Sequence, residues 1–305
     1  MFVIRKARAA GERVAALGTF DGVHRGHRSL IRQAGKLAAE YGVPLRVCTF
    51  DRHPLEVLRP DSPPELLSTM PEKAREMYGL GVDEMELIPF DRRTADLEPE
   101  EFLERLRDAM KVRAVVAGWN YSFGRKGRGN ADLLRKDGRE HGYEVLIVPP
   151  TTLEDGTAIS SSLVRQKLRE GKTEEAEELL GYRYSLTGTV GQGKHKGHEL
   201  GFPTANIQPW KRKALPKYGV YTCLLTTAER QYPAVANIGL QPTLPSGGVT
   251  VEAHILEECP DLYGEKARLT ILTMLRGEKR FDSPQELMKQ IEKDREKALK
   301  SFNMA

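Results

Sequence analysis

The residues best suited to chemistry lie together near the start of the chain, in residues 18–27, which read GTFDGVHRGH. The three glycines of this segment would let the backbone approach a ligand closely, because glycine has no Cβ to obstruct it. His24 and His27 are three residues apart and can face the same ligand. With an unperturbed pKa of about 6.5, each imidazole can donate a hydrogen bond to a phosphoryl oxygen and become charged as negative charge builds there. We expect both to stabilise charge without acting as nucleophiles.

A strand and a helix would position this segment. Residues 14–17 form a short apolar run that predicts a strand, and residues 28–40 have the pattern of a helix. A glycine-rich turn between a strand and a helix favours phosphate, since a helix N-terminus offers unpaired N–H groups and a partial positive charge. The segment therefore predicts a phosphate-binding site.

The first half of the chain alternates short apolar runs with charged helical segments, which is typical of an α/β, Rossmann-like domain with a parallel sheet. A capping box of Thr69 and Glu72, with Pro71 between them, should start a helix that ends at Gly79. Further helices are expected over residues 98–110, 161–170 and 173–180, and strands over residues 14–17, 45–50, 85–88, 114–117 and 145–148.

After Gly181 the pattern changes to short runs of β-branched and aromatic residues separated by glycine and proline. This predicts a small antiparallel β-barrel or sandwich. A C-terminal helix should begin at a capping box of Ser283 and Glu286, with Pro284 as its first residue. We therefore expect two domains, residues 1–182 and 183–305, which agrees with a length of 305 residues.

Composition and charge exclude several classes of protein. Hydrophobic residues make up 39% of the chain and charged residues 30%, as in ordinary water-soluble proteins and unlike disordered or membrane-spanning chains. A formal charge of +4 is too small and too evenly spread to predict nucleic-acid binding, and the basic stretch 210–213 is interpreted as a solvated loop. With no apolar run long enough to span a bilayer and no signal-peptide core, we expect a cytoplasmic protein that binds neither membranes nor nucleic acid. Three widely spaced cysteines predict neither disulfides nor zinc.

Two further segments of the first half could contact a nucleotide. The segment ISSSLVR places Ser160, Ser161 and Ser162 at a helix start, where hydroxyls can cap the helix and bind phosphates, and it adds the fixed cation Arg165. Asn120 follows the fourth expected strand. Ligands of open parallel sheets bind at the carboxyl ends of the strands, so Asn120 is a candidate as well.

The segment GTVGQGK at residues 188–194 has the spacing of a P-loop. His195 stands where a P-loop has its Mg²⁺-binding hydroxyl, and the glycines and proline that follow exclude the helix that a P-loop must open. We reject a P-loop at this position.

The motifs of the first half resemble those of the HxGH nucleotidyltransferase superfamily, whose members transfer a nucleotidyl group from a nucleoside triphosphate to a phosphate and release pyrophosphate. GTFDGVHRGH is similar to its GxFDGxHxGH motif, and ISSSLVR to its ISSTxxR motif. Class I aminoacyl-tRNA synthetases carry a looser form of the first motif, but this sequence has neither their KMSKS-like loop nor an anticodon-reading domain. The resemblance implies that His24 and His27 are catalytic and that ATP is bound by Gly18, Phe20, Asp21, Gly22, Asn120, Ser160, Ser161, Ser162 and Arg165.

Three motifs of the second half resemble the riboflavin kinase family in type and order. They are LGFPTAN, which ends at Asn206, NIGLQPT, which begins at Asn237, and the strand residue Glu252. The resemblance implies that Glu252 is the general base that takes the proton from the ribityl 5′-hydroxyl. It also implies a site for Mg²⁺, held by Thr204 and Asn206, and for ATP, bound by Gly201, Pro203, Thr204 and Asn206. Phosphoryl transfer depends mainly on positioning and electrostatic stabilisation, so these groups suffice.

Together the two halves are similar to the two-headed riboflavin kinase and FAD synthetase family. The resemblance implies that the barrel makes FMN from riboflavin and ATP, that the α/β domain makes FAD from FMN and ATP, and that Mg²⁺ serves both reactions. His198 stands where the family usually has arginine and carries at most a partial charge at neutral pH, which leaves the strength of the kinase open. Two alternatives also stay open: an adenylyltransferase for another phosphate acceptor with a flavin-binding tail, and a non-catalytic sensor of flavins or nucleotides.

Overall fold

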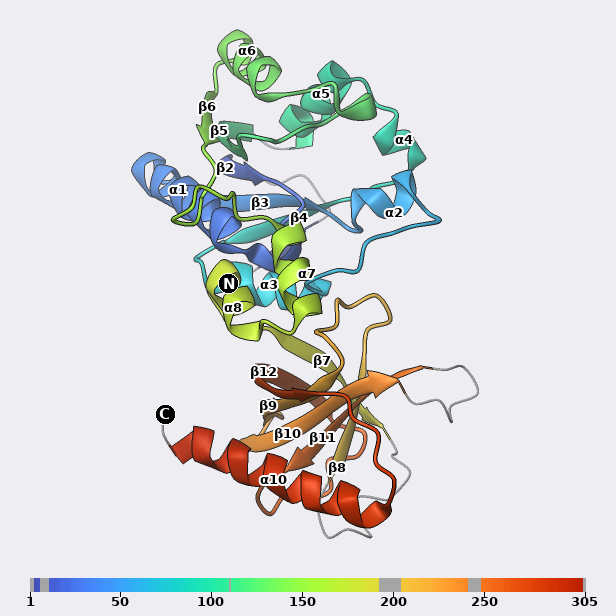
Figure 1. Ribbon diagram of the computed structural model, residues 1–305. Helices are drawn as coiled ribbons and strands as arrows, with labels where there is room; N and C mark the ends of the chain where they lie inside the picture. The colour runs from blue at the N-terminus through green and yellow to red at the C-terminus, as the bar shows by residue number, and fades with distance from the viewer. Residues whose placement is uncertain (1–2, 6–10, 110, 192–203, 241–247, 304–305) are drawn as a thin grey trace. The chain divides into compact units, whose positions relative to one another are not determined.

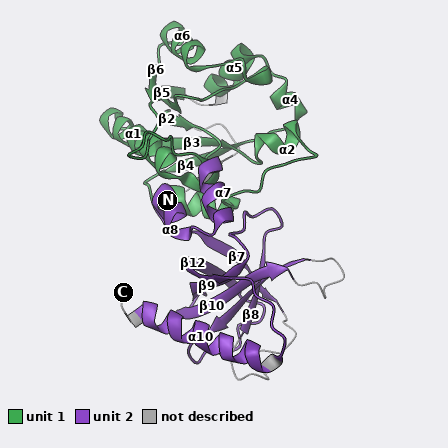
Figure 2. Ribbon diagram, in the orientation of Figure 1, with its two compact units in different colours: residues 1–161 green, residues 162–305 purple. Residues whose placement is uncertain are grey.

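A computed structural model of the chain describes residues 3–5, 11–109, 111–191, 204–240 and 248–303. The chain forms two compact units, residues 1–161 and 162–305 (Figure 2). The first is an α/β unit, and the second contains two helices, a β-barrel and a C-terminal helix (Figure 1). The division falls before residue 182, so the expected boundary between two activities at that residue stays a prediction. Within the described ranges, no helix is long and apolar enough to cross a bilayer.

The strands of the first unit are β1 (Val3–Arg5), β2 (Glu12–Leu17), β3 (Leu45–Phe50), β4 (Glu84–Ile88), β5 (Lys111–Gly118) and β6 (Glu144–Val148). They form one parallel sheet in the order β1-β4-β3-β2-β5-β6. From the central strand β2 the chain builds outward to β4, then returns to place β5 on the other side of β2. The strand order therefore reverses between β2 and β5, which is where open parallel sheets bind their ligands.

The helical segments of the first unit are η1 (Asp21–Val23), α1 (Arg25–Tyr41), α2 (Pro54–Leu58), α3 (Met70–Tyr78), α4 (Arg92–Ala95), α5 (Pro99–Ala109), η2 (Arg125–Gly127) and α6 (Ala131–His141). They cover both faces of the sheet, as β2 illustrates. Val14 and Ala16 pack in one buried cluster with α1 and α3, whereas Ala15 and Leu17 pack in another with α5 and α6. A strand buried on both faces must be apolar throughout, which is why β2 reads as a continuous apolar run.

Local hydrogen bonds set the helix ends, largely as the sequence predicts. The Thr69 hydroxyl accepts from the Glu72 N–H at 3.4 Å, and the Glu72 carboxylate accepts from the Thr69 N–H at 2.9 Å, so the expected capping box of α3 is confirmed. Short α2 was not expected, although His53 and Glu56 form a similar box at its start. Strand β1 and helix α4 were also missed, because three or four residues are too few to show a periodicity.

Apart from Ser161, the first residue of α7, the second unit contains α7 (Ser161–Glu170), α8 (Thr173–Leu180), β7 (Ser185–Gly191), β8 (Thr204–Pro209), β9 (Gly219–Thr226), β10 (Gln231–Leu240), β11 (Val249–Ile255), β12 (Lys266–Gly277) and α10 (Pro284–Asn303). The six strands close a barrel in the order β10-β11-β8-β7-β12-β9, with every pair antiparallel. The expected antiparallel domain is therefore a barrel and not a sandwich. Helix α10 starts where the Ser283 hydroxyl accepts from the Glu286 N–H at 3.3 Å, as predicted.

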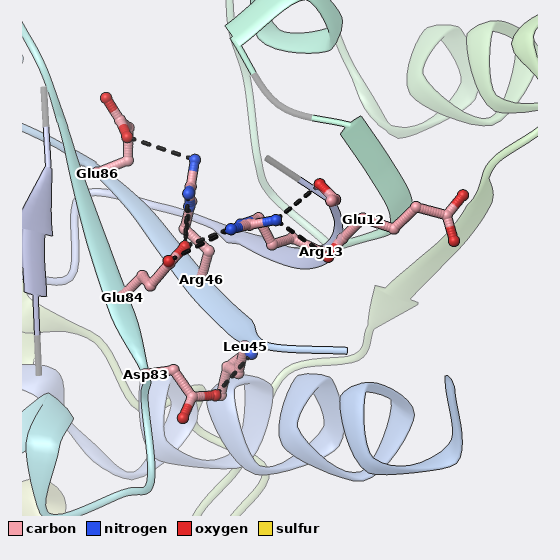
Figure 3. Close-up of polar contacts among 8 residues, drawn as sticks. Glu12, Arg13, Leu45, Arg46, Asp83, Glu84 and Glu86 are labelled. Carbon is pink, nitrogen blue, oxygen red and sulfur yellow. Dashed lines mark hydrogen bonds and ion pairs between the residues drawn. The ribbon is translucent and has the colours of Figure 1, made fainter. Parts of the chain in front are cut away.

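A buried cluster of charges joins three strands of the parallel sheet near their amino ends (Figure 3). The Glu84 carboxylate of β4 accepts from Nε of Arg13 in β2 and from Nε of Arg46 in β3, both at 2.9 Å. Arg46 is fully buried and also pairs with Glu86. Burial alone would raise the pKa of Glu84, but the hydrogen bonds from the two arginines outweigh it and hold that pKa below its usual value. The resulting stabilisation is present at neutral pH and is lost as the pH falls through the lowered pKa.

We expect Glu84→Ala to lower the free energy of unfolding of the first unit by about 3 to 5 kcal/mol, because it leaves Arg13 and Arg46 buried without their shared carboxylate. The chain has one tryptophan in each unit, Trp119 and Trp210. Urea unfolding followed by Trp119 fluorescence in a Trp210→Phe background would measure the change.

The matched control is Arg105→Ala, which removes an exposed i,i+4 pair with Glu101 and should cost less than about 1 kcal/mol. Equal losses of stability in the two variants would show that the buried cluster contributes no more than a surface pair.

Candidate active sites

The turn after β2 has an unusual backbone. Phe20 and Val23 adopt left-handed conformations, with φ of 51° and 38°, which are costly for residues that have a Cβ. Gly22 has a φ of 76°, and Gly18 has no room for a side chain, because a Cβ there would lie 2.9 Å from the Phe20 ring. Strained turns of this kind cluster at ligand-binding sites. Gly22 therefore supplies the positive φ that the turn requires, and Gly18 leaves room for the Phe20 ring.

Asp21 ties this turn to the segment that precedes α3. Its carboxylate accepts from the backbone N–H groups of Leu67 at 3.0 Å and Ser68 at 3.1 Å. The Ser68 hydroxyl in turn accepts from the backbone N–H of Gly22 at 3.0 Å. With an exposed fraction of only 3%, Asp21 holds the turn from inside the protein. Contact between Asp21 and a nucleotide stays a prediction.

His24 and His27 lie side by side at the start of α1. Their rings stack with centroids 3.7 Å apart, and Nδ1 of His24 accepts from the His27 N–H at 3.4 Å, which caps the helix. Nδ1 of His27 is buried and has no hydrogen-bond partner in the described part of the chain. Burial lowers the pKa of His27 well below its usual value, and positive charge on His24 and Lys73 lowers it further. The His27 imidazole is therefore neutral at pH 7, with a buried nitrogen that no described protein group satisfies.

Two other predicted segments of the first unit reach the same edge of the sheet. Leu17 of β2 pairs with Ala117 of β5, so the turn after β2 and the exposed Asn120 follow adjacent strands. The Ser161 hydroxyl donates to the backbone carbonyl of Asp21 at 2.9 Å, which fixes the start of α7 against the turn. These contacts bring two separate motifs to the place where the strand order reverses.

The remaining residues of the serine-rich motif are placed by α7. Ser160 directly precedes the helix and is half-buried, Ser162 is exposed, and Arg165 is buried one turn further along. Ser162 and Arg165 belong to the second unit. Their contact with a nucleotide stays a prediction.

Lys73 of α3 is a residue that no sequence motif indicates. It is only 7% exposed, and its Nζ donates to the carbonyl of Thr19, in the turn after β2, at 2.7 Å. Its charge also acts on His27. A lysine inside a capped amphipathic helix resembles a surface residue in sequence, so only the structure identifies it.

In the barrel, strand register brings the predicted kinase residues together. Glu252 of β11 pairs with Asn206 of β8 on one side and with Asn237 of β10 on the other, and His254 pairs with Thr204. Register partners project from the same face of a sheet, with Cβ atoms about 5 Å apart. All five side chains therefore lie on one patch of the sheet.

This patch faces outward from the barrel. In β11, Val251, Ala253 and Ile255 are buried in the barrel interior, whereas Glu252 and His254 between them are half-buried. Burial lowers the pKa of His254, and the negative charge of Glu252 opposes that change. The alternation shows why a carboxylate can sit in a barrel strand without entering the core.

A cavity of about 400 Å³ opens beside this patch, between the barrel and α10. Its volume is in the range of small-molecule pockets. Helix α10 is held over β10 and β12 by apolar contacts that include Val235 and Ala298 and by an ion pair of Arg276 with Asp294 at 2.9 Å. The lining includes polar and charged groups of the barrel and apolar groups of the C-terminal segment: Asn237, Glu252, His254, Phe281, Leu287 and Ile291.

Gly239 of the second-half motifs lies beside the side chain of Glu278. A Cβ at this position would lie 2.2 Å from a carboxylate oxygen of Glu278, so a larger residue would displace the flexible end of that side chain. Gly201 and Pro203, predicted to bind ATP, lie outside the described residues, as does His198. In the described ranges, no group of three His, Cys, Asp or Glu side chains could hold a metal ion.

Two different family models match the first and second parts of the chain. The family model for FAD synthetase matches residues 6–163, and the model for riboflavin kinase matches residues 180–302. Curated relatives match over nearly the whole chain. The "Bifunctional riboflavin kinase/FMN adenylyltransferase" of Listeria monocytogenes is 38% identical, over 92% of this chain and 90% of its own length. The proteins of the same description from Escherichia coli K12 and Bacillus subtilis are 36% and 32% identical, each over 95% of this chain, with 93% and 92% of their own lengths covered.

A solved structure shares the fold over nearly the whole chain. The crystal structure of a Streptococcus pneumoniae protein described as a macrolide-efflux protein is 32% identical, with a TM-score of 0.87 and 97% of both chains covered. That description applies to the Streptococcus pneumoniae protein and is not carried over to this chain. The family models and the curated relatives agree on two flavin-related activities.

We expect Asp21→Asn to loosen the turn after β2, because an amide side chain offers one acceptor oxygen where the carboxylate offers two. Losing a charged acceptor of backbone N–H groups should cost roughly 1.5 to 3 kcal/mol. Hydrogen exchange at the amides of Leu67 and Ser68 would measure the effect and should become faster.

The control is Asp132→Asn, since Asp132 is an exposed residue at the start of α6. If exchange at residues 67 and 68 were the same in Asp21→Asn, in the control and in the unmodified protein, the carboxylate would not be what holds the turn.

Proposed function

The chain belongs to the bifunctional riboflavin kinase/FMN adenylyltransferase family, and from this premise we propose that its two activities use the two sets of residues described above. The enzyme phosphorylates riboflavin with ATP to give FMN, and it adenylylates FMN with ATP to give FAD and pyrophosphate. We assign FAD formation to residues 1–182 and FMN formation to residues 183–305. The observation that carries the assignment is that Glu252 and the His24–His27 pair lie in different compact units.

In adenylyl transfer, a phosphate oxygen of FMN attacks the α-phosphorus of ATP, and pyrophosphate leaves with the electron pair of the broken P–O bond. Charge therefore builds on phosphate oxygens, and groups that donate hydrogen bonds to them lower the barrier. Neutral imidazoles such as that of His27 can donate such bonds. We assign this role to His24 and His27, at the N-terminus of α1, whose partial positive charge acts in the same direction.

The other motif residues of this site bind and orient ATP. The turn 18–22 and the serines before and at the start of α7 meet through the hydrogen bond from Ser161 to the Asp21 carbonyl. We assign the triphosphate to the turn and Ser161, and the resemblance of the serine-rich motif to ISSTxxR is what adds Arg165 as a fixed cation. Asn120, after the neighbouring strand, is assigned to the nucleotide because it follows the switch point of the sheet.

In the kinase reaction, the ribityl 5′-hydroxyl oxygen attacks the γ-phosphorus of ATP while the bond to ADP breaks. We assign Glu252 as the general base that accepts the hydroxyl proton. Its position between Asn206 and Asn237 in the sheet supports this role, since neighbouring amides can orient the carboxylate and the phosphates. The cavity beside Glu252, with Phe281, Leu287 and Ile291 in its lining, is assigned to the flavin ring.

Two of the proposed kinase residues are suitable ligands for a Mg²⁺ ion that binds together with ATP. Thr204 and Asn206 offer a hydroxyl and an amide oxygen, which are hard donors of the kind that Mg²⁺ prefers. Mg²⁺ usually takes its other ligands from water and phosphates, which agrees with a patch that has a single carboxylate. When bound, Mg²⁺ would neutralise phosphate charge, and Thr204 and Asn206 would hold it.

We expect His27→Ala to lower the rate of FAD formation by about 100-fold or more, because a charge-stabilising donor to the phosphates is lost. FMN formation by the same purified protein should be unchanged and serves as the internal control. Chromatography of the flavins formed from riboflavin, ATP and Mg²⁺ measures both rates at once.

A matched histidine control is His141→Ala, on the partly exposed end of α6, which should leave both rates unchanged. Retention of full FAD formation by His27→Ala would contradict the assignment of the first site.

We expect the reverse pattern for Glu252→Gln, which keeps the shape of the side chain but removes the base. Loss of a general base typically lowers a rate by 10²- to 10⁴-fold, so FMN formation should fall by about that factor. FAD formation from added FMN should continue at the normal rate. The comparison variant is Glu258→Gln, an exposed residue outside the patch, and equal kinase rates in the two variants would exclude Glu252 as the base.

A further inference from the structure

Lys73 is a buried cation with few protein partners. It is 7% exposed, and its Nζ has one hydrogen bond to a described residue, the 2.7 Å bond to the carbonyl of Thr19. An ammonium group has three N–H donors. Two of them are therefore not used by the described part of the chain.

No carboxylate of the described residues forms an ion pair with Lys73. Burial lowers the pKa of Lys73 to about 8, although the negative charges of Asp21 and Glu56 act to raise it. Asp21 is engaged with the backbone N–H groups of Leu67 and Ser68. An ammonium group buried in this way is costly unless an anion compensates it.

Three other features at Lys73 also favour an anion. The carbonyl that it contacts belongs to the turn after β2, between Gly18 and Gly22. Its positive charge lowers the pKa of His27, so the two side chains are close enough to interact electrostatically. His27 has its own buried nitrogen without a described partner, and α1 begins beside it. A phosphate group bound here would satisfy both side chains at once.

We propose that Lys73 is a further catalytic residue of FAD formation, which contacts the phosphate oxygens of the reacting nucleotide next to His27. The inference rests on the proposed assignment of adenylyl transfer to the first site. The reaction itself is unchanged: a bond forms between the FMN phosphate oxygen and the α-phosphorus of ATP, and the bond to pyrophosphate breaks. Lys73 transfers no proton and stabilises the negative charge that shifts toward pyrophosphate.

The first test compares Lys73→Met, which keeps the aliphatic stem, with Lys73→Arg, which keeps the charge. We expect Lys73→Met to lower kcat/KM for FAD formation by about 100- to 1,000-fold, the range found when one charge-stabilising donor is removed. Lys73→Arg should keep activity within about tenfold of the unmodified enzyme. FMN formation should be unchanged in both, and Lys36→Met on the exposed side of α1 should change neither rate.

Thermal unfolding separates this role from a structural one. Removing a buried charge that has no ion-pair partner should leave the unfolding temperature of Lys73→Met unchanged or raise it. If Lys73→Met unfolds at a lower temperature and Lys73→Arg loses FAD formation to the same extent, Lys73 is a structural residue and the proposal is wrong.

The pH dependence gives a second readout that a structural role would not produce. The groups that act on Lys73 are Asp21 from η1, Glu56 from α2 and His27 from α1. His27 stays neutral above pH 7 because its pKa is lowered, whereas the pKa of Lys73, lowered to about 8, places its change of charge in this range. For the unmodified enzyme, kcat/KM for FAD formation should fall above about pH 8. Arginine remains charged, so the profile of Lys73→Arg should stay flat through this range.

His27→Ala distinguishes failure of this inference from failure of the site itself. Loss of FAD formation in His27→Ala with full activity in Lys73→Met would overturn only the role of Lys73. Full activity in both variants would show that adenylyl transfer takes place elsewhere.

Discussion

The first site depends on the hydrogen bonds that the buried carboxylate of Asp21 accepts from the backbone of Leu67 and Ser68. They join two segments that are more than 40 residues apart: the turn that leads into α1 and the residues directly before α3. Both helices begin from these segments, so one carboxylate fixes where the histidines of α1 stand relative to Lys73 of α3. Because the donors are backbone groups, the link does not depend on the side chain at residue 67.

The second site depends on strand register instead. Glu252 faces Asn206 and Asn237 only because β8, β10 and β11 pair as they do. A slip of one residue in β11 would turn Glu252 into the apolar barrel and bring Val251 to the surface. The apolar residues that alternate with the functional ones therefore protect the active geometry, since burial of a carboxylate in the core would be prohibitive.

Most of the architecture follows from local signals in the sequence, and most of the site geometry does not. Capping residues such as Thr69 and Ser283 predict helix starts, because the hydrogen bonds involved span three residues. Closure of the barrel depends on β12 pairing with β7 and β9 and on β11 pairing with β8, which are strands far away in sequence, so the pattern could not choose between a barrel and a sandwich. The histidines were found through a short motif. Lys73 was not found, because the contacts that mark it are with Thr19 and His27, about 50 residues earlier in the chain. Its burial is also not visible in the sequence of a charged helix.

The two sheets differ in what they leave open to other chains. A closed barrel has every strand paired on both sides, so it offers no free row of N–H and C=O groups to an incoming strand. The parallel sheet ends at β1 and β6, and β1 is only three residues long, which limits the addition of another strand at that margin. In a partly unfolded copy of this chain, an incoming strand would therefore find its longer row of free backbone groups at β6, whereas the closed barrel would offer none.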